Sequence, residues 1–300
     1  DAAADRFRTR AAQGRGATLN LTGDLPYPDL KTRRGDGRAV LDARLTGDLL
    51  GFPSVRARDA ELTARFDGAV SGWIETFRLD GAADARLAAR AVQGAGLDAA
   101  AAVVTAARAQ VRVSRDDALR WSVQTPLSLT AASARLGQTQ VRNLALSSGG
   151  LTLGGRDAAL EATGPLSAAF DRIGFGDLAL KRGRADLNLD IVSDGAVRIG
   201  AEGSLRAADG AWPLFGPAGR DDIVELGRMK RALSAFAVNA PAVRFSTGSA
   251  GTMIDLTRPA TLTPANGGVL TIAQGGGGAY RAEPGRLGGG APVSYKHLTL

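Results

Sequence analysis

The chain of 300 residues contains no cysteine, and its only histidine is His297, close to the C-terminus. The absence of cysteine excludes disulfide bonds and thiolate metal sites. Without a histidine elsewhere, the sequence offers no imidazole base for a hydroxyl nucleophile and no imidazole ligand for a metal. It also contains no run of about 18 apolar residues, so no membrane-spanning helix is predicted.

Aromatic residues make up only 5% of the chain, whereas glycine and proline number 40 and 12. This composition favours many turns and thin sheets lined by aliphatic residues over a dense aromatic core. The formal net charge of +7 would suggest a nucleic-acid partner, but acids follow the arginines closely, as in Arg184, Asp186 and Asp190. We interpret the charge as a solvated polar face and predict no nucleic-acid partner.

Strict alternation of apolar and polar residues is the strongest pattern in the sequence. Leu41, Ala43 and Leu45, for example, are separated by single polar residues. Successive side chains of a strand point to opposite faces, so each alternating segment is predicted to be a β-strand with one apolar side. The pattern recurs over most of the chain and therefore predicts an all-β fold with one or few helices.

Dipeptides that favour tight turns are predicted to join the strands into hairpins. The clearest case is Ser193-Asp194-Gly195, which separates two alternating segments. The other predicted turns are Asp36-Gly37, Asp67-Gly68, Asp80-Gly81, Gly149-Gly150, Asp209-Gly210 and Asn266-Gly267.

The alanine-rich stretch 82–109 is ambiguous between helix and strand. We favour strands, because alternating segments flank the stretch on both sides. One predicted strand face runs through it and beyond, and consists of Val103, Thr105, Ala107, Ala109, Val111 and Val113.

One helix is predicted at about residues 220–237. Its apolar stripe recurs at helical spacing and consists of Ile223, Leu226, Met229, Leu233 and Phe236. Acidic residues at its start and basic residues further on complement the helix dipole. Both a helix packed on an edge or end of the sheet and a lid over a groove are compatible with this stripe.

Few residues are suited to catalysis. Asp116-Asp117 is a weak acid–base candidate, because adjacent side chains on a strand point to opposite faces. Asp221-Asp222 is better explained by capping of the predicted helix. Asp186 and Asp190 share their polar face with an arginine and an asparagine, so they do not form a dedicated acid pair. We predict no catalytic residue, no metal site and no cofactor, and hence a protein that is not an enzyme.

Two features carry a resemblance to a known family. One is the long succession of amphipathic strands, and the other is a C-terminal passage composed of Trp212-Pro-Leu-Phe215, Arg220 to Phe236 and Ala240-Pro-Ala-Val-Arg-Phe245, leading to Leu262 and Gly267-Gly-Val-Leu270. Together they resemble the AsmA-like repeating β-groove proteins of Gram-negative envelopes, most closely the YdbH-like branch. The resemblance implies an elongated, curved antiparallel sheet that forms a hydrophobic groove. It also implies phospholipid transport between the inner and outer membranes through the periplasm.

The sequence patterns, together with the resemblance, suggest how the chain is organised. We expect an irregular N-terminal segment at 1–16, a repeating β-groove at 17–218, an amphipathic helix at 219–239 and C-terminal strands with a Gly-rich loop at 240–292. Residues 293–300 resemble a translated sequencing adapter, so we interpret them, His297 included, as an artefact. We interpret the chain as an internal fragment whose inner-membrane anchor would precede it.

The expected partners are phospholipid acyl chains and, through parts outside this fragment, the inner and outer membranes. The predicted groove lining is Leu41, Leu45, Leu62, Phe66, Leu127, Leu129, Leu144, Leu146, Leu187, Leu189, Ile191, Val197, Ile199, Val243 and Phe245. The predicted lid helix carries Ile223, Leu226, Met229, Leu233 and Phe236. The alternative is a structural or adhesive β-sandwich or β-helix surface protein, because closed cores are commoner than open grooves.

Overall fold

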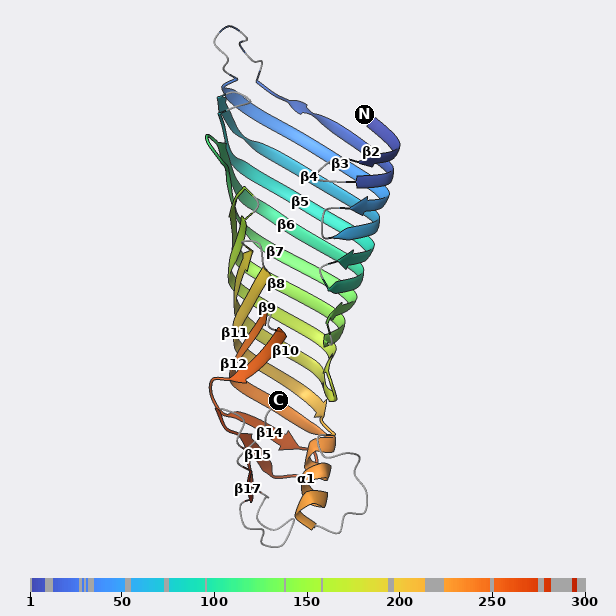
Figure 1. The fold of residues 1–300 in the computed structure, drawn as a ribbon, viewed down its shortest axis with the longest axis vertical. Coiled ribbons are helices and arrows are strands. Elements are labelled where there is room, and N and C mark those ends of the chain that lie inside the picture. Colours follow the sequence, from blue (N-terminus) through green and yellow to red (C-terminus); the bar gives the residue numbers. More distant parts are fainter. Residues whose placement is uncertain are drawn as a thin grey trace. The chain divides into compact units, whose positions relative to one another are not determined.

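The computed structural model is almost entirely β-structure (Figure 1). It describes residues 2–8, 13–26, 29, 31, 35–51, 55–72, 76–94, 96–137, 139–157, 159–193, 197–213, 224–248, 251–274, 278–281 and 293–295. These residues form seventeen strands and one helix, α1 (Val224–Ser234). The strands are β1 (Ala2–Arg8), β2 (Gln13–Asp24), β3 (Gly37–Gly51), β4 (Arg56–Gly72), β5 (Phe77–Gly94), β6 (Leu97–Arg115), β7 (Leu119–Leu136), β8 (Thr139–Arg156), β9 (Ala159–Phe175), β10 (Leu178–Ser193), β11 (Val197–Ala211), β12 (Phe236–Gly248), β13 (Gly251–Leu256), β14 (Ala260–Pro264), β15 (Val269–Ile272), β16 (Gly278–Arg281) and β17 (Val293–Tyr295).

The chain divides into two compact units, which are described separately. Unit 1 comprises Asp1–Gly137, Leu144–Leu166 and Asp190–Val197, and unit 2 comprises Gln138–Asn143, Ser167–Leu189 and Arg198–Leu300. All-β structure, which the alternation predicted, is confirmed in both units, and α1 belongs to unit 2.

In unit 1, strands β1 to β7 pair consecutively and antiparallel, each with its neighbours in the chain. The strands from blue to green in Figure 1 show this meander. Strands β3 to β7 contain between 15 and 19 residues each, well above the common length of about 5–6. The alternation in their sequences gives the whole meander one apolar face and one polar face.

Residues with positive φ interrupt the alternation of unit 1. At Asp59 in β4 (φ 46°) and Ala101 in β6 (φ 49°), two successive side chains face outward and the apolar phase then resumes, while the register with the neighbouring strands stays the same. Alanines on either side of each position are buried, and Leu50 is buried with them. One core cluster consists of Ala17, Leu50, Ala57, Ala60 and Ala89, so small residues pack in this part of the sheet.

Unit 2 has a core of large side chains around α1. In it, β12 pairs with β11, β13 and β14, and β14 pairs with β15, all antiparallel. The buried core residues are Phe170, Leu180, Ala207, Trp212, Met229, Ala232, Leu233, Phe236, Leu262 and Leu270. The backbone N–H of Trp212 donates to the carbonyl of Leu233, 2.8 Å away, which ties the end of the helix to the segment after β11.

Several detailed predictions are confirmed. The stretch 82–109 forms β5 and β6 and contains no helix among its described residues. A turn at Asn266-Gly267 joins the antiparallel strands β14 and β15, and the Gly267 N–H donates to Pro264 O. Strands β10 and β11 lie on either side of Asp194-Gly195, which is outside the described residues.

Other boundaries were wrong. The N-terminal segment predicted to be irregular contains β1 and the start of β2. The helix ends at Ser234, earlier than predicted, and Phe236 begins β12 instead of closing the helical stripe. Residues Val293–Tyr295 form β17, which pairs with β16, and their interpretation as an artefact stays a prediction; His297 is outside the described residues.

Most of the predicted hairpin turns lie inside strands. Asp67-Gly68, Asp80-Gly81, Gly149-Gly150 and Asp209-Gly210 are in β4, β5, β8 and β11 respectively, and Gly37 begins β3. The glycine at two of these positions has a packing reason. Gly68 and Gly81 face each other in the register, and a Cβ atom on Gly68 would lie only 2.6 Å from the Gly81 Cα.

Candidate functional site

The register of unit 1 lines up large apolar side chains across six strands. Residues directly opposite each other in an antiparallel pair point to the same face. Successive pairs from β2 to β7 therefore form one row on the apolar face: Leu19, Leu45, Leu62, Leu87, Val104 and Leu129. Every member is a leucine or a valine, so the row is apolar along its entire length.

A parallel row on the same face has small side chains in its centre. It runs through Leu21, Ala43, Ala64, Ala85, Ala106 and Leu127. A third, shorter row near the end of the strands consists of Val70, Leu79, Val113 and Trp121. We call this apolar face of β2–β7 the trough.

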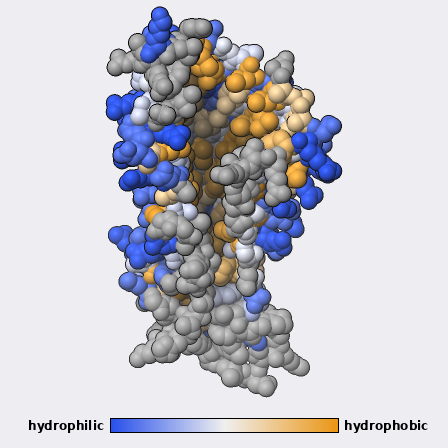
Figure 2. Space-filling view, turned by 45° about the horizontal axis from the view of Figure 1, so that its top comes forward, coloured by the Kyte–Doolittle hydropathy of each residue, from blue (hydrophilic) through white to orange (hydrophobic). Residues whose placement is uncertain are grey.

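The trough is open to solvent within unit 1. Every member of the leucine row is at least partly exposed, and Leu19 and Leu21 retain 39% and 53% of their accessible surface. Figure 2 shows hydrophobic residues lining a hollow in the part turned towards the viewer, with hydrophilic residues on its flanks. A row of leucines in a closed core would instead be buried, as Leu233 in unit 2 is.

Aromatic rings in the trough lie over glycines of their own or a neighbouring strand. A Cβ atom on Gly68 or Gly81 would lie 2.5 Å or 2.8 Å from ring atoms of Phe66. The same holds for Gly155 beneath Trp121, where the nearest ring atom would be 2.6 Å away. Each glycine thus leaves the space that the ring occupies against the backbone, and the rings of Phe66 and Trp121 pack on the sheet.

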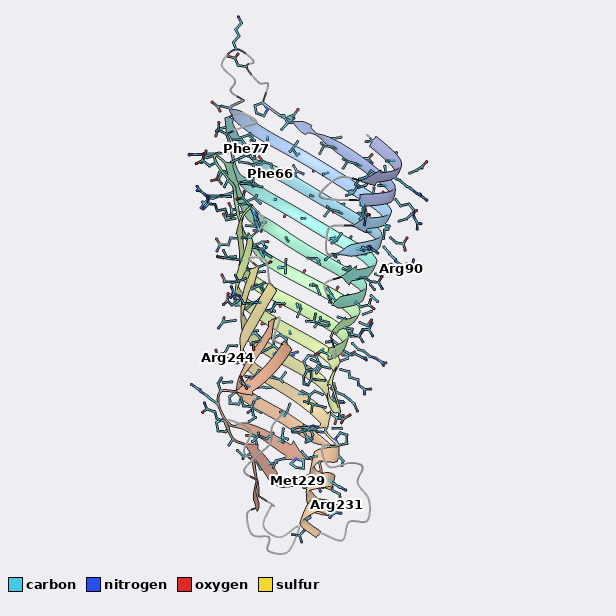
Figure 3. All side chains as sticks on the ribbon, in the orientation of Figure 1. Phe66, Phe77, Arg90, Met229, Arg231 and Arg244 are labelled. Atoms are coloured by element: carbon cyan, nitrogen blue, oxygen red, sulfur yellow. The ribbon has the colours of Figure 1, made fainter. Side chains whose placement is uncertain are left out.

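The polar face of unit 1 is covered by ion pairs between neighbouring strands. Arg38 Nη2 lies 2.6 Å from Asp67 Oδ2, and the hydrogen bond from Arg38 lowers the pKa of the Asp67 carboxyl. Arg44 and Arg112 pair in the same way with Glu61 and Asp80. Arg90, which pairs with Asp59, points away from the ribbon in Figure 3. These pairs are largely exposed, so each contributes little to stability.

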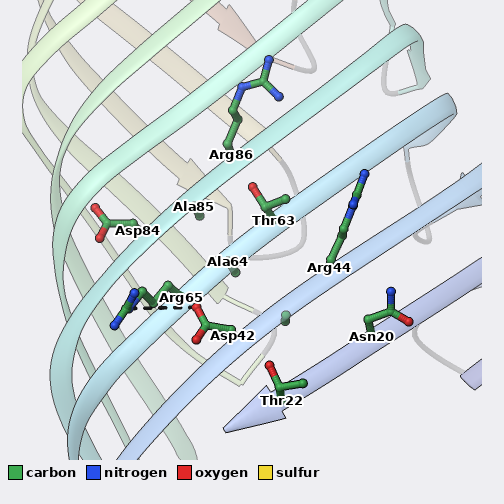
Figure 4. Close-up of a pocket in the computed structure, with 11 residues that line it drawn as sticks. Asn20, Thr22, Asp42, Arg44, Thr63, Ala64, Arg65, Asp84, Ala85 and Arg86 are labelled. Carbon is green, nitrogen blue, oxygen red and sulfur yellow. Dashed lines mark ion pairs between the residues drawn. The ribbon is translucent and has the colours of Figure 1, made fainter. Parts of the chain in front are cut away.

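A shallow depression of about 360 Å³ lies on this polar face (Figure 4). Its side chains come from successive strands, with Thr63 between Arg44 and Arg86 in the register. Arg65 and Asp42, 4.0 Å apart, form the ion pair drawn there. We interpret the depression as part of the solvated face.

The structure divides the predicted groove lining between the two units. Leu41, Leu45, Leu62, Phe66, Leu127, Leu129, Leu144, Leu146 and Ile191 belong to unit 1 and are partly exposed. Leu187, Leu189, Ile199 and Phe245 belong to unit 2 and are also partly exposed, whereas Val243 is buried in a small core with Ala240 and Ala260. The side chain of Val197 is outside the described residues.

The predicted lid helix packs into a core. Met229 and Leu233 of α1 are 5% and 3% exposed and contact the unit 2 cluster, and Figure 3 shows Met229 and Arg231 on this helix. Phe236 belongs to the same cluster from β12. Ile223 and the side chain of Leu226 are outside the described residues. These contacts agree with the first of the two interpretations of the stripe, a helix packed on the sheet.

Sequence reasoning missed part of the trough because of a bulge. The single face predicted for residues 103–113 changes sides at Arg108, whose φ is 49°. Val104 and Ala106 face the trough before this point, and Ala109 and Val111 face it after. The Arg108 N–H donates to Asp84 Oδ1, 2.8 Å away, so the acid on the adjacent strand satisfies the bulged amide.

Within the part of the chain that the structure describes, no group of three or more His, Asp or Glu residues could hold a metal ion. No helix there is long and apolar enough to cross a membrane. Comparison of the chain with family models, with curated proteins and with solved structures gives no match.

Proposed function

We propose that the trough carries phospholipid acyl chains and that the protein transports phospholipid, without catalysing a reaction, between the inner and outer membranes of a Gram-negative envelope. The observation that carries the proposal is the row from Leu19 to Leu129, which is apolar across six strands and yet partly exposed along its length. The resemblance to the AsmA-like, YdbH-like proteins points to the same function.

The free energy of lipid transfer explains why such a face would be useful. Exposing an acyl chain to water costs about 0.8 kcal/mol per methylene group, or more than about 20 kcal/mol for a two-chain phospholipid. A continuous apolar surface removes most of this cost without any chemistry. Aliphatic side chains such as Leu62 and Leu87 bind hydrocarbon without fixing its orientation, whereas selective pockets use a few precisely placed polar groups.

The composition of the trough supports an acyl-chain ligand over a second packed sheet. Its central row is alanine at Ala43, Ala64, Ala85 and Ala106, flanked by the leucine row. This leaves a low strip of small side chains beside a ridge of large ones, a shape that can hold a flexible chain. The structural or adhesive alternative requires a protein partner to cover the same face.

The test is photocrosslinking in cells with the full-length protein. A benzophenone amino acid replaces Leu62, on the trough, or Thr63, the next residue on the polar face. After irradiation, mass spectrometry of the purified protein is expected to find phospholipid adducts at position 62 and only background at position 63.

Two results would contradict the proposal. Crosslinks from position 62 to protein alone would mean that the face is packed, as in a structural or adhesive protein. Equal lipid adducts at both positions would mean contact with a membrane surface and not binding in the trough.

A further inference from the structure

One charged side chain stands on the otherwise apolar trough. The register places Arg115, the last residue of β6, opposite Phe77 of β5 and Leu119 of β7. Val111 and Val113 precede it on the same face at the period of a strand. All the other described residues that the register places on the trough face of β2–β7 are apolar, glycine or threonine.

Arg115 is exposed and has no carboxylate partner among the described residues. No ion pair joins it to Asp116 or Asp117, which follow in the turn before β7. Asp157, nearby in unit 1, instead accepts a hydrogen bond from the Leu119 N–H at 3.1 Å. The guanidinium is therefore available to an anion at the end of the trough.

Further polar groups lie at the same strand ends. On the polar face, Ser114 lies between Arg78 and Arg120 in the register, and these residues line a depression of about 440 Å³. Arg112, which also lines it, is 3.3 Å from Asp80, whereas Arg78 and Arg120 form no ion pair among the described residues.

The opposite ends of the same strands differ. There the trough face carries Leu97 opposite Leu136, which are 36% and 39% exposed. The nearest arginine, Arg135, lies on the polar face and is 3.5 Å from Asp98. An amphiphile lying along the strands would therefore find an unpaired cation at one rim and only leucines at the other.

We infer that Arg115 binds the phosphoryl group of an amphiphile whose hydrocarbon lies in the trough. This inference rests on the proposed function and adds an orientation for the ligand. A guanidinium presents donors in a fixed fork that matches two phosphate oxygens. Charge-assisted hydrogen bonds of this kind are about twice as strong as neutral ones. The head group then lies at the rim formed by Phe77, Arg115 and Leu119, and the acyl chains extend from it past Val113 and Val111 into the trough.

The test compares three probes on the full chain. They are dihexanoyl phosphatidic acid, which has chains and phosphate, dihexanoylglycerol, which has chains alone, and inorganic phosphate. Binding is followed by the fluorescence of Trp121, which lies opposite Val113 on the trough face, after Trp73 and Trp212 are replaced by phenylalanine. The variants are Arg115→Gln, Arg115→Lys and, as a matched loss of charge on the polar face, Arg86→Gln.

We expect Arg115→Gln to weaken phosphatidic acid binding by about tenfold and to leave dihexanoylglycerol binding unchanged. Arg115→Lys should recover part of the loss, and Arg86→Gln should bind both lipids as the unsubstituted protein does. Unchanged dihexanoylglycerol binding also shows that the variant is folded.

Other results overturn the inference in distinguishable ways. Equal loss for both lipids, or no loss for phosphatidic acid, would remove the role of Arg115 while leaving the trough as a lipid site. Arg115-dependent binding of inorganic phosphate without binding of either lipid would assign the site to a free anion. Binding of none of the probes to the unsubstituted protein would contradict the proposed function itself.

Discussion

Units 1 and 2 use the same amphipathic strands but treat their apolar faces differently. In unit 1 the buried residues are mostly alanines, and large side chains such as Leu62 and Leu87 stay partly exposed. In unit 2 the large side chains are the buried ones, and α1 contributes Met229 and Leu233 to their core. Alternation alone therefore produces an apolar face; a further element that packs on it turns the face into a core.

The two units therefore differ in whether their apolar side chains are free to bind a ligand. In unit 2 the large apolar side chains already pack against one another, so they contribute to stability. The leucine row of unit 1 still has surface to bury, so its residues contribute less to folding and can contribute to binding.

The largest effect is expected from truncating equivalent leucines in the two units. Leu233→Ala should lower the free energy of unfolding of unit 2 by about 2–5 kcal/mol, because it leaves a cavity in a packed core. Leu62→Ala should lower that of unit 1 by about 1 kcal/mol or less, because the side chain is already partly exposed.

Urea denaturation with single-tryptophan variants measures the two losses separately. Trp212 reports on unit 2 and Trp121 on unit 1, with the remaining tryptophans replaced by phenylalanine. Equal losses for the two leucine variants would mean that the trough is as tightly packed as the core, and the comparison would not hold.

An intermediate effect is expected from adding one methyl group beneath an aromatic ring. In Gly81→Ala the new Cβ would meet Asp67 O at 2.5 Å and Phe66 Cε2 at 2.8 Å, so both the backbone and the ring must move. We expect a loss of about 1–3 kcal/mol in unit 1.

Gly149→Ala provides the control, because no atom lies within 4 Å of the added Cβ. It should be neutral or slightly stabilising, since alanine loses less backbone entropy on folding than glycine. A Gly81 variant as stable as the Gly149 variant would show that the ring of Phe66 does not need the glycine pair.

The smallest effect concerns the exposed polar face. The pKa of Asp67 is lowered from its ordinary value of 3.8, mainly by the hydrogen bond from Arg38. The stabilisation by the ionised Asp67 carboxylate is therefore present above the pKa that this group has in the unfolded chain. It is lost as the pH falls through the lower pKa that the group has in the folded protein. Between pH 7 and pH 3, Asp67→Asn should lose slightly less stability than the unsubstituted protein, as measured by urea midpoints with Trp121. An equal loss for Asp67→Asn and the unsubstituted protein would contradict this prediction.

Away from the residues with positive φ, alternation was enough to place individual side chains on the correct face. Leu45 and Leu62 were both predicted to be apolar-face residues, and the register brings them together. The pairing itself was not predictable, because Asp67-Gly68 and Asp80-Gly81 have the sequence of turns but lie within strands. Their glycines serve packing beneath Phe66, a contact between strands that no local pattern reveals.

Residues with positive φ account for most of the remaining differences. Asp59, Ala101 and Arg108 adopt positive φ although none of them is glycine, so the sequence carries no sign that the alternation changes phase there. Arg115, in contrast, continues the alternation of Val111 and Val113, and extending that pattern by two residues would have identified it. The helix was recognised from its stripe, but its burial depends on partners such as Leu262 and Leu270, which are distant in the sequence.

The consecutive pairing of β2 to β7 makes the length of the trough easy to change by insertion. Each strand pairs only with the strands before and after it in this series, so an added hairpin would lengthen the meander by roughly 10 Å, two strand spacings. A single-residue deletion inside a strand is quite different, because it moves every following side chain to the opposite face. Duplication of whole hairpins would thus lengthen the trough without moving any side chain to the opposite face, since the number of strands sets its length and the residues per strand set its width.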